Sequence, residues 1–101
     1  MSEAIKFNLD KEILTIYLKG ELNSSNAEDV DKRLGEILSQ STFNKLIFDF
    51  KELTYISSAG LRIILRTKQT CDDTSLVNVS KDVFNVFEMV GFTQIMKIQR
   101  P

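Results

Sequence analysis

Hydrophobic and polar residues alternate near the start of the chain in the pattern of β-strands. Apolar residues occupy every second position over 5–9 and again over 14–18, and a polar turn at residues 10–12 separates the two segments. Such alternation is typical of strands with one buried face, and two strands around a short polar turn indicate a hairpin. We expect Gly20 to end the second strand.

After residue 26 the apolar spacing changes to that of a helix. From Ala27 to about Gln40, apolar residues recur at intervals of three or four, which predicts an amphipathic helix. Ser25 precedes this segment, and Glu28 follows Ser25 by three positions, which is the spacing of a capping box. We therefore expect the helix to begin just after Ser25.

The middle of the chain predicts a strand, a connection and a second helix. The segment Lys45–Phe50 contains a continuous apolar run, which is typical of a strand buried on both faces in a parallel sheet. Residues 51–55 are predicted to connect it to a helix from about Ala59 to Thr70. At about 100° per residue, the side chains of this helix that should pack on the sheet are Leu61, Ile64 and Leu65.

The last third predicts a short strand over 76–79, a helix over Lys81–Val90 and a final strand over 95–98. Ser80 is suited to cap the helix, and Gly91 is suited to follow its end. The apolar stripe of this helix should comprise Val83, Phe84, Phe87 and Val90. A hairpin followed by alternating helices and strands indicates an α/β fold. We expect one domain over residues 1–101, with a mixed sheet of about five strands, parallel crossovers after the hairpin, and three to four helices.

The composition of the chain argues against several classes of function. The chain has 101 residues, a net charge of -1 and no histidine, so it lacks both the basic footprint of a nucleic-acid binder and the means for histidine-based catalysis. No glycine-rich phosphate loop or metal-ligand spacing occurs, so we expect no cofactor and no metal.

Cys71 is the single cysteine, which suits a reducing compartment. Residues 1–4 lack a signal-peptide pattern, and no apolar run approaches the roughly 20 residues of a membrane span, so we expect a cytoplasmic protein with no membrane insertion.

Asp49 is the one acid at a position where open α/β sheets often carry function, the end of a buried strand. Receiver domains place a phosphoacceptor aspartate on a comparable strand end, but this chain lacks their acidic pair after the first strand. We expect Asp49 either to bond backbone groups at the strand end or to fix the serine-containing segment that follows.

The segment Tyr55 to Leu61 contains two adjacent serines between a predicted strand and a predicted helix. The simple interpretation is that Ser57 or Ser58 caps the helix. The alternative is that a hydroxyl at this helix N-terminus carries a phosphate, which the unpaired N–H groups and the helix dipole tolerate. Arg62 and Arg66 share a stripe on the same side as Ser58. They form either a solvated cationic face or, at Arg62, a contact for a phosphate on Ser58 or for an acidic partner.

The same segment carries a resemblance to a known family. Residues 46–50 followed by 53–61, with Ser58 two positions before the Gly-Leu pair, resemble the core motif of the STAS domain, the anti-sigma factor antagonist fold. The sequence Gly-Glu-Leu-Asn at 20–23 is similar to the family's Gly-x-Leu-Asp segment, and the helix at 83–90 followed by Gly-Phe resembles its C-terminal pattern.

The resemblance implies a phosphorylation-switched binding module and not an enzyme. Ser58 matches the family's phosphorylated residue, and Ser57 is an alternative acceptor. The implied partners are an anti-sigma factor serine kinase, which the unphosphorylated domain binds so that a sigma factor is released, and a metal-dependent serine phosphatase. The chain would act as a monomer or weak dimer. The residues expected at the partner interface are Leu22, Asn23, Ser24, Tyr55, Ile56, Ser57, Ala59, Gly60 and Arg62.

Two positions depart from the family pattern. Ser57 and Asn23 stand where the family usually has aspartate, so negative charge near Ser58 is reduced. This leaves a second possibility, a stand-alone STAS subunit of another signalling or transporter-associated complex that binds constitutively. A third possibility, a small enzyme or nucleotide-binding protein, would show saturable ligand binding without a protein partner.

Overall fold

The computed structural model describes residues 5–101, so the prediction about a signal peptide at residues 1–4 lies outside the described part. The elements are β1 Ile5–Asp10, β2 Ile13–Leu22, α1 Ala27–Gln40, β3 Lys45–Ile56, α2 Ser58–Thr70, β4 Thr74–Val77, α3 Lys81–Met89, the 3₁₀ helix η1 Phe92–Gln94, and β5 Lys97–Ile98.

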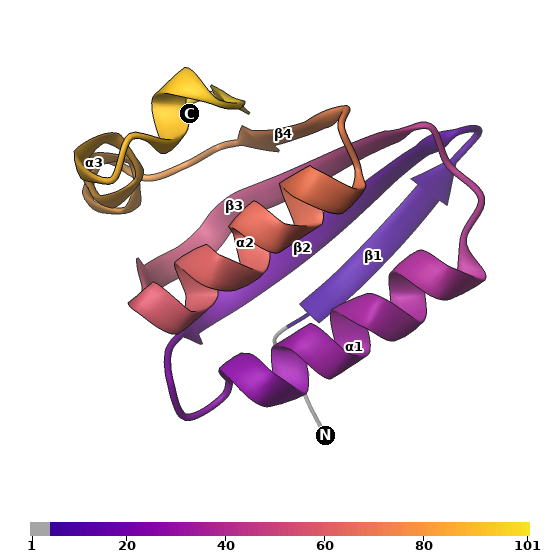
Figure 1. Ribbon diagram of the computed structural model, residues 1–101, viewed down its shortest axis with the longest axis horizontal. Helices are drawn as coiled ribbons and strands as arrows, with labels where there is room; N and C mark the ends of the chain where they lie inside the picture. Colours follow the sequence, from indigo (N-terminus) through magenta and orange to yellow (C-terminus); the bar gives the residue numbers. More distant parts are fainter. Residues whose placement is uncertain (1–4) are drawn as a thin grey trace.

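The five strands form one mixed sheet in the order β1-β2-β3-β4-β5, of which Figure 1 labels the first four. β1 pairs antiparallel with β2 as a hairpin, and the later pairs are all parallel. Each parallel neighbour follows a helical crossover: α1 leads from β2 to β3, α2 from β3 to β4, and α3 with η1 from β4 to β5. The predicted α/β class, the hairpin and the parallel crossovers are therefore confirmed.

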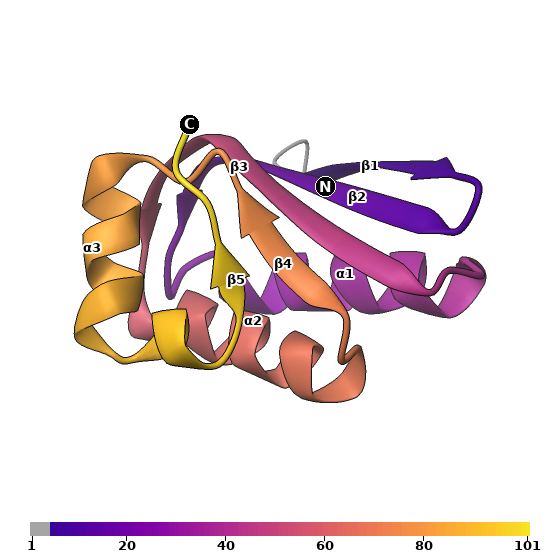
Figure 2. The same ribbon diagram turned by 90° about the horizontal axis from the view of Figure 1, so that it is seen from above.

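The two longest helices cover one face of the sheet. Figure 2 shows α1 and α2 beneath the strands, whereas α3 stands beside the end of β3. In β3, Leu46, Phe48 and Phe50 are buried, but Ile47 and Asp49, which point to the other face, remain half-exposed. The prediction that this strand is buried on both faces is therefore wrong, because no helix among the described residues covers the second face of its first half.

β3 is twice as long as predicted, and residues 51–55 belong to it. Its pairing with β2 shifts register twice, between Tyr17 and Lys19 and between Gly20 and Glu21. At each shift β3 contains one residue more than β2, as in a β-bulge. The buried side chains of this half consequently recur every three positions, at Phe50, Leu53 and Ile56.

Gly20 does not end β2, which continues to Leu22. Gly20 lies within the irregular part of the pairing and has φ +80, a conformation that glycine adopts at little cost. Its carbonyl accepts a hydrogen bond from Thr54 Oγ1 at 3.0 Å. The glycine therefore lets β2 follow the bulged half of β3 instead of leaving it.

The helices bury slightly different faces from those expected. In α2 the buried residues are Gly60, Ile63, Ile64 and Thr67, whereas Leu61 and Leu65 are only partly buried beside them. Of the predicted α3 stripe, Val83 and Phe87 are buried and Phe84 partly so. Val90 is the exception at 50% exposed, because it lies beyond the last turn.

The C-terminal segment confirms two local predictions and corrects a third. Ser80 caps α3 by accepting a hydrogen bond from the N–H of Val83, and Gly91 follows the helix in the left-handed region with φ +82. The final strand is only two residues long because η1 occupies the preceding turn, which leaves Ile95 exposed and Met96 buried.

Candidate functional site

The two serines at the start of α2 have different surroundings. Ser57 is the N-cap, with φ -97 and ψ 176, and its Oγ accepts a hydrogen bond from the N–H of Gly60 at 3.3 Å. Ser58 is the first residue of the helix and is exposed. Among the described residues, no hydrogen bond involves the Ser58 hydroxyl. Ser57 therefore performs the structural role that the sequence allowed for either serine, and the hydroxyl of Ser58 remains accessible.

The start of α2 is joined directly to the end of β2. The backbone N–H of Ser57 donates to the carbonyl of Leu22 at 2.8 Å. Gly60 lies against the same strand end, where an added Cβ would be 2.7 Å from Leu22 Cγ and 2.8 Å from Ile56 Cγ1. These contacts hold the serine-containing turn beside the loop of residues 22–26.

Asn23 shapes that loop. Its Oδ1 accepts hydrogen bonds from the N–H groups of Ser25 at 2.9 Å and Asn26 at 3.1 Å, and its Nδ2 donates to Glu21 Oε1 at 3.2 Å. The capping box predicted from Ser25 is wrong, because Asn26 is the residue at the N-cap position and no side chain in the described part of the chain caps α1. The Asx turn around Asn23 takes the place of a cap by ordering the backbone just before the helix.

The expected interface residues divide into a supporting layer and a surface. Leu22, Ile56 and Gly60 are buried, so they hold the two segments together from below. The half-buried members of the set are Asn23, Ser57 and Ala59, and the exposed members are Ser24, Tyr55 and Arg62. The accessible part of the predicted site is therefore formed by Ser58 with these exposed neighbours.

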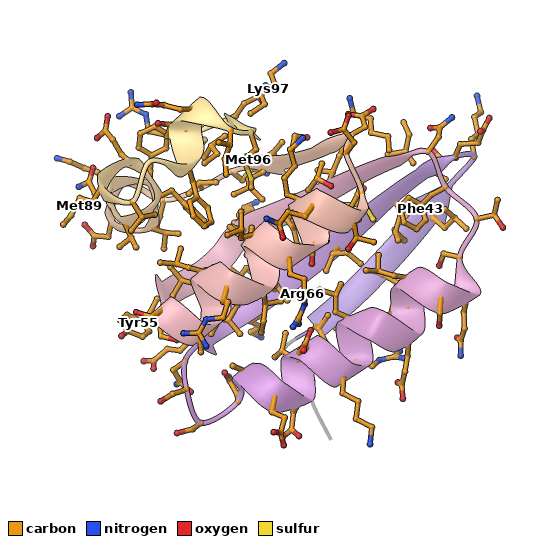
Figure 3. All side chains as sticks on the ribbon, in the orientation of Figure 1. Phe43, Tyr55, Arg66, Met89, Met96 and Lys97 are labelled. Atoms are coloured by element: carbon orange, nitrogen blue, oxygen red, sulfur yellow. The ribbon has the colours of Figure 1, made fainter. Side chains whose placement is uncertain are left out.

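Two large apolar side chains lie on the surface at the same end of the molecule. Tyr55, near the end of β3, is 50% exposed, and Met89, at the end of α3, is 85% exposed. Figure 3 shows both of them pointing outward at the end where α2 begins. Val90, beside Met89, is exposed and does not belong to the buried stripe predicted for this helix. Its position directly before Gly91 is the sequence signal that the helix has ended.

The two arginines of α2 are engaged differently. Arg66, whose side chain points toward α1 in Figure 3, forms an ion pair with Asp31 of that helix. Arg62, one turn nearer Ser58, is exposed and forms no ion pair or hydrogen bond within residues 5–101. The stripe expected from the sequence thus contains one arginine that ties two helices together and one that faces solvent.

Asp49 accepts a hydrogen bond from the backbone, as predicted, but it lies inside β3 and not at the end of the strand, and it does not fix the serine segment. Its Oδ1 accepts from the N–H of Lys51 at 3.0 Å, and both carboxylate oxygens accept from Asn78 Nδ2 at 3.2 Å. Asn78 has φ 56, a conformation that asparagine tolerates better than most residues. Asp49 therefore joins β3 to the turn after β4, on the face of the sheet opposite α1 and α2.

A shallow hollow lies on this uncovered face. Its lining residues are Lys6, Tyr17, Leu18, Lys19, Asp49, Lys51 and Glu52. None of them belongs to the serine-containing turn or to the loop of residues 22–26, so the hollow is separate from the candidate site.

Other chemistry is sparse in the described part of the chain. Residues 5–101 contain no group of three or more histidine, cysteine, aspartate or glutamate side chains placed to hold a metal ion. None of the helices there is long and apolar enough to cross a membrane. Cys71 is a free thiol at the end of α2, and partial burial raises its pKa, which keeps it in the less reactive protonated form.

Comparisons with known proteins agree with this arrangement. A family model described as the STAS domain matches residues 4–100. The "Putative anti-sigma factor antagonist BtrV" of Bordetella bronchiseptica is 32% identical over 100 residues, which cover 93% of this chain and 85% of BtrV. The "Anti-sigma F factor antagonist" of Paenibacillus polymyxa is 26% identical over 102 residues, which cover 97% of this chain and 87% of that protein.

Solved structures show the same fold. The anti-sigma factor antagonist SpoIIAA in its unphosphorylated form matches with a TM-score of 0.77 and 24% identity, covering 94% of this chain and 87% of SpoIIAA. SpoIIAA in its phosphorylated form, described as a Bacillus cell fate determinant, matches with a TM-score of 0.69 and 23% identity, covering 94% and 90% of the two chains.

Proposed function

The chain belongs to the STAS domain family, and from this premise we propose that it is an anti-sigma factor antagonist whose partner binding is switched by phosphorylation of Ser58. The observation that carries the proposal is the division of roles between the two serines. Ser57 caps the helix and Ser58 is exposed, so Ser58 can be modified without loss of the cap.

The proposed reaction is phosphoryl transfer from a nucleoside triphosphate held by the kinase. The Oγ of Ser58 attacks the terminal phosphorus, the bond from that phosphorus to the leaving nucleoside diphosphate breaks, and the hydroxyl proton passes to a base or to water in the kinase. This chain supplies the acceptor and its position, and the kinase supplies the catalysis. A serine phosphatase would restore the hydroxyl by hydrolysis with a metal-activated water.

The position of Ser58 suits a switch that leaves the fold unchanged. A phosphoserine carries about -1.5 to -2 charge and three acceptor oxygens, and the first turn of a helix accommodates that charge. A partner that covers Ser58 would instead be obstructed by the phosphate group, and binding would require the desolvation of its charge, which is unfavourable. We therefore place the effect of phosphorylation at the interface, on the surface formed by Ser58, Tyr55, Ser24 and Arg62.

The names of the relatives support an anti-sigma factor as the proposed partner. The two relatives named above are called anti-sigma factor antagonists, and SpoIIAA is known in both phosphorylation states. For this chain we propose that the unphosphorylated form binds an anti-sigma factor serine kinase, which then releases a sigma factor. It would work in the cytoplasm as a monomer or weak dimer, as a binding module without catalytic activity of its own.

The two departures from the family pattern bear on how readily Ser58 is modified. At position 57 a serine caps the helix, which an aspartate would also do. At position 23 the asparagine orders the loop and contacts Glu21, so one carboxylate remains next to this position. Negative charge beside the site is therefore reduced but not abolished.

The test is intact-mass analysis of the protein from its native host, with peptide mapping across residues 55–62. The expected result is a single phosphate on Ser58 that phosphatase treatment removes. The variant S58A should lose the phosphate, whereas S57A should keep it. A phosphate on Ser57 would move the proposed site, and no phosphate under any growth or stress condition would leave a constitutive binding module.

A further inference from the structure

The two arginines that follow Ser58 at intervals of four residues have different surroundings in the structure. Arg66 is paired with Asp31 of α1, so its charge is already balanced within the molecule. Arg62 is exposed, and within residues 5–101 it contacts no acidic side chain at ion-pair distance. Of the two cations, Arg62 is therefore the one that can respond to a new charge on Ser58.

The helix geometry brings Ser58 and Arg62 together. Both residues belong to α2, which is continuous from Ser58 to Thr70. Side chains four positions apart lie on the same side of a helix as neighbours, and the favourable order has the acidic group on the N-terminal side. An arginine guanidinium offers a planar set of donors that matches phosphate oxygens.

We propose that a phosphate on Ser58 pairs with Arg62 within the same helix. Phosphorylation then changes the surface in two ways, because it adds an anion and also occupies the exposed cation. A partner that presents an acidic group to Arg62 would lose that contact at the same time as it meets the phosphate. This inference rests on the proposed function for the place of the phosphate, but it concerns an interaction that can be measured without the partner.

The experiment uses the full chain with phosphoserine incorporated at position 58 during synthesis, so it does not depend on the native kinase. The second pKa of the phosphate is measured by ³¹P NMR titration in the parent protein and in R62Q, R62K and R66Q. A nearby guanidinium favours the dianion, so R62Q should raise this pKa by about 0.3 unit, the equivalent of one such helix pair. R62K retains the positive charge, so the phosphate pKa in this variant should stay close to that of the parent protein.

R66Q is the matched control, since it removes the same charge from the next turn of the same helix. It should leave the phosphate pKa unchanged within experimental error, because Arg66 is paired with Asp31. Circular dichroism of each variant checks that the fold is intact. Equal titration curves for the parent and R62Q, or equal shifts for R62Q and R66Q, would overturn the proposed pair.

The two proposals can fail separately. If Ser58 is never phosphorylated in the host, the proposed switch fails, yet the titration of the synthetic phosphoprotein still decides whether Arg62 pairs with a phosphate there. If the titration shows no pair while the host protein is phosphorylated, the switch stands and acts through the phosphate alone.

Discussion

Gly60 lies so close to Leu22 that a Cβ atom on Gly60 would be 2.7 Å from the Cγ of Leu22. The same atom would be 2.8 Å from Ile56 Cγ1, so no side chain fits between α2 and the ends of β2 and β3. The backbone bond from Ser57 N–H to the Leu22 carbonyl closes the same contact. The position of Ser58 on the surface therefore depends on a glycine two residues further along the helix.

Replacing Gly60 by alanine should destabilise the protein by about 1 to 3 kcal/mol, as overpacking does. Denaturant unfolding measures this directly. The control is G35A in α1, where the residue is exposed and an added Cβ meets no atom of the described residues within 4 Å. That change should stabilise by about 0.5 to 1 kcal/mol through helix propensity. If G60A and G35A changed the free energy of unfolding in the same direction, the close contact at Gly60 would not be what determines the effect of G60A.

The two serines should respond differently to alanine substitution. S57A removes the N-cap bond to Gly60 and should lower the free energy of unfolding by about 1 kcal/mol. S58A removes an exposed hydroxyl that has no hydrogen-bond partner within residues 5–101, and it should change the free energy of unfolding by less than about 0.5 kcal/mol. Chemical denaturation of both variants tests the assignment, and S57D, which retains a capping oxygen, should be close to the parent. A larger loss in S58A than in S57A would reverse the roles given to the two residues.

The amide of Asn23 should matter through its contact with Glu21. N23D keeps the oxygen that accepts from Ser25 and Asn26 but places two carboxylates side by side, so we expect a loss of about 0.5 to 1 kcal/mol near neutral pH. A double-mutant cycle with E21Q measures the coupling. In the E21Q background the glutamine amide can donate to the new carboxylate, so N23D should cost less. Equal costs in both backgrounds would show that Asn23 and Glu21 do not interact.

Cys71 should make stability depend on pH in the alkaline range. Burial raises the pKa of its thiol in the folded state, so the unfolded chain loses this proton at lower pH than the native protein. Stability from this group is therefore present below the unfolded pKa and declines as pH rises through the folded value. C71S should flatten this part of the pH profile. Alkylation by iodoacetamide at mildly alkaline pH should also be slower in the native protein than in the unfolded chain.

Regular segments of the fold were predictable because their local pattern and their tertiary role agree. The alternation over residues 5–9 and 14–18 places one face in the core and predicts the hairpin. The helical spacing after Ala27 likewise matches the buried stripe of α1. The second half of β3 escaped prediction because its two bulges give buried residues a period of three, which is the period of neither a regular strand nor a helix.

The candidate site divides in the same way. The sequence alone determined that a serine pair stands at a strand-to-helix junction, that two arginines follow at helical spacing, and that the motif resembles the STAS family. Only the tertiary structure decided which serine caps the helix and which arginine is paired, because both depend on neighbours distant in the sequence. Leu22 accepts the bond that fixes the turn at Ser57, and Asp31 takes the charge of Arg66. Partners of this kind leave no periodic signal in the chain, since they are chosen by how the elements pack.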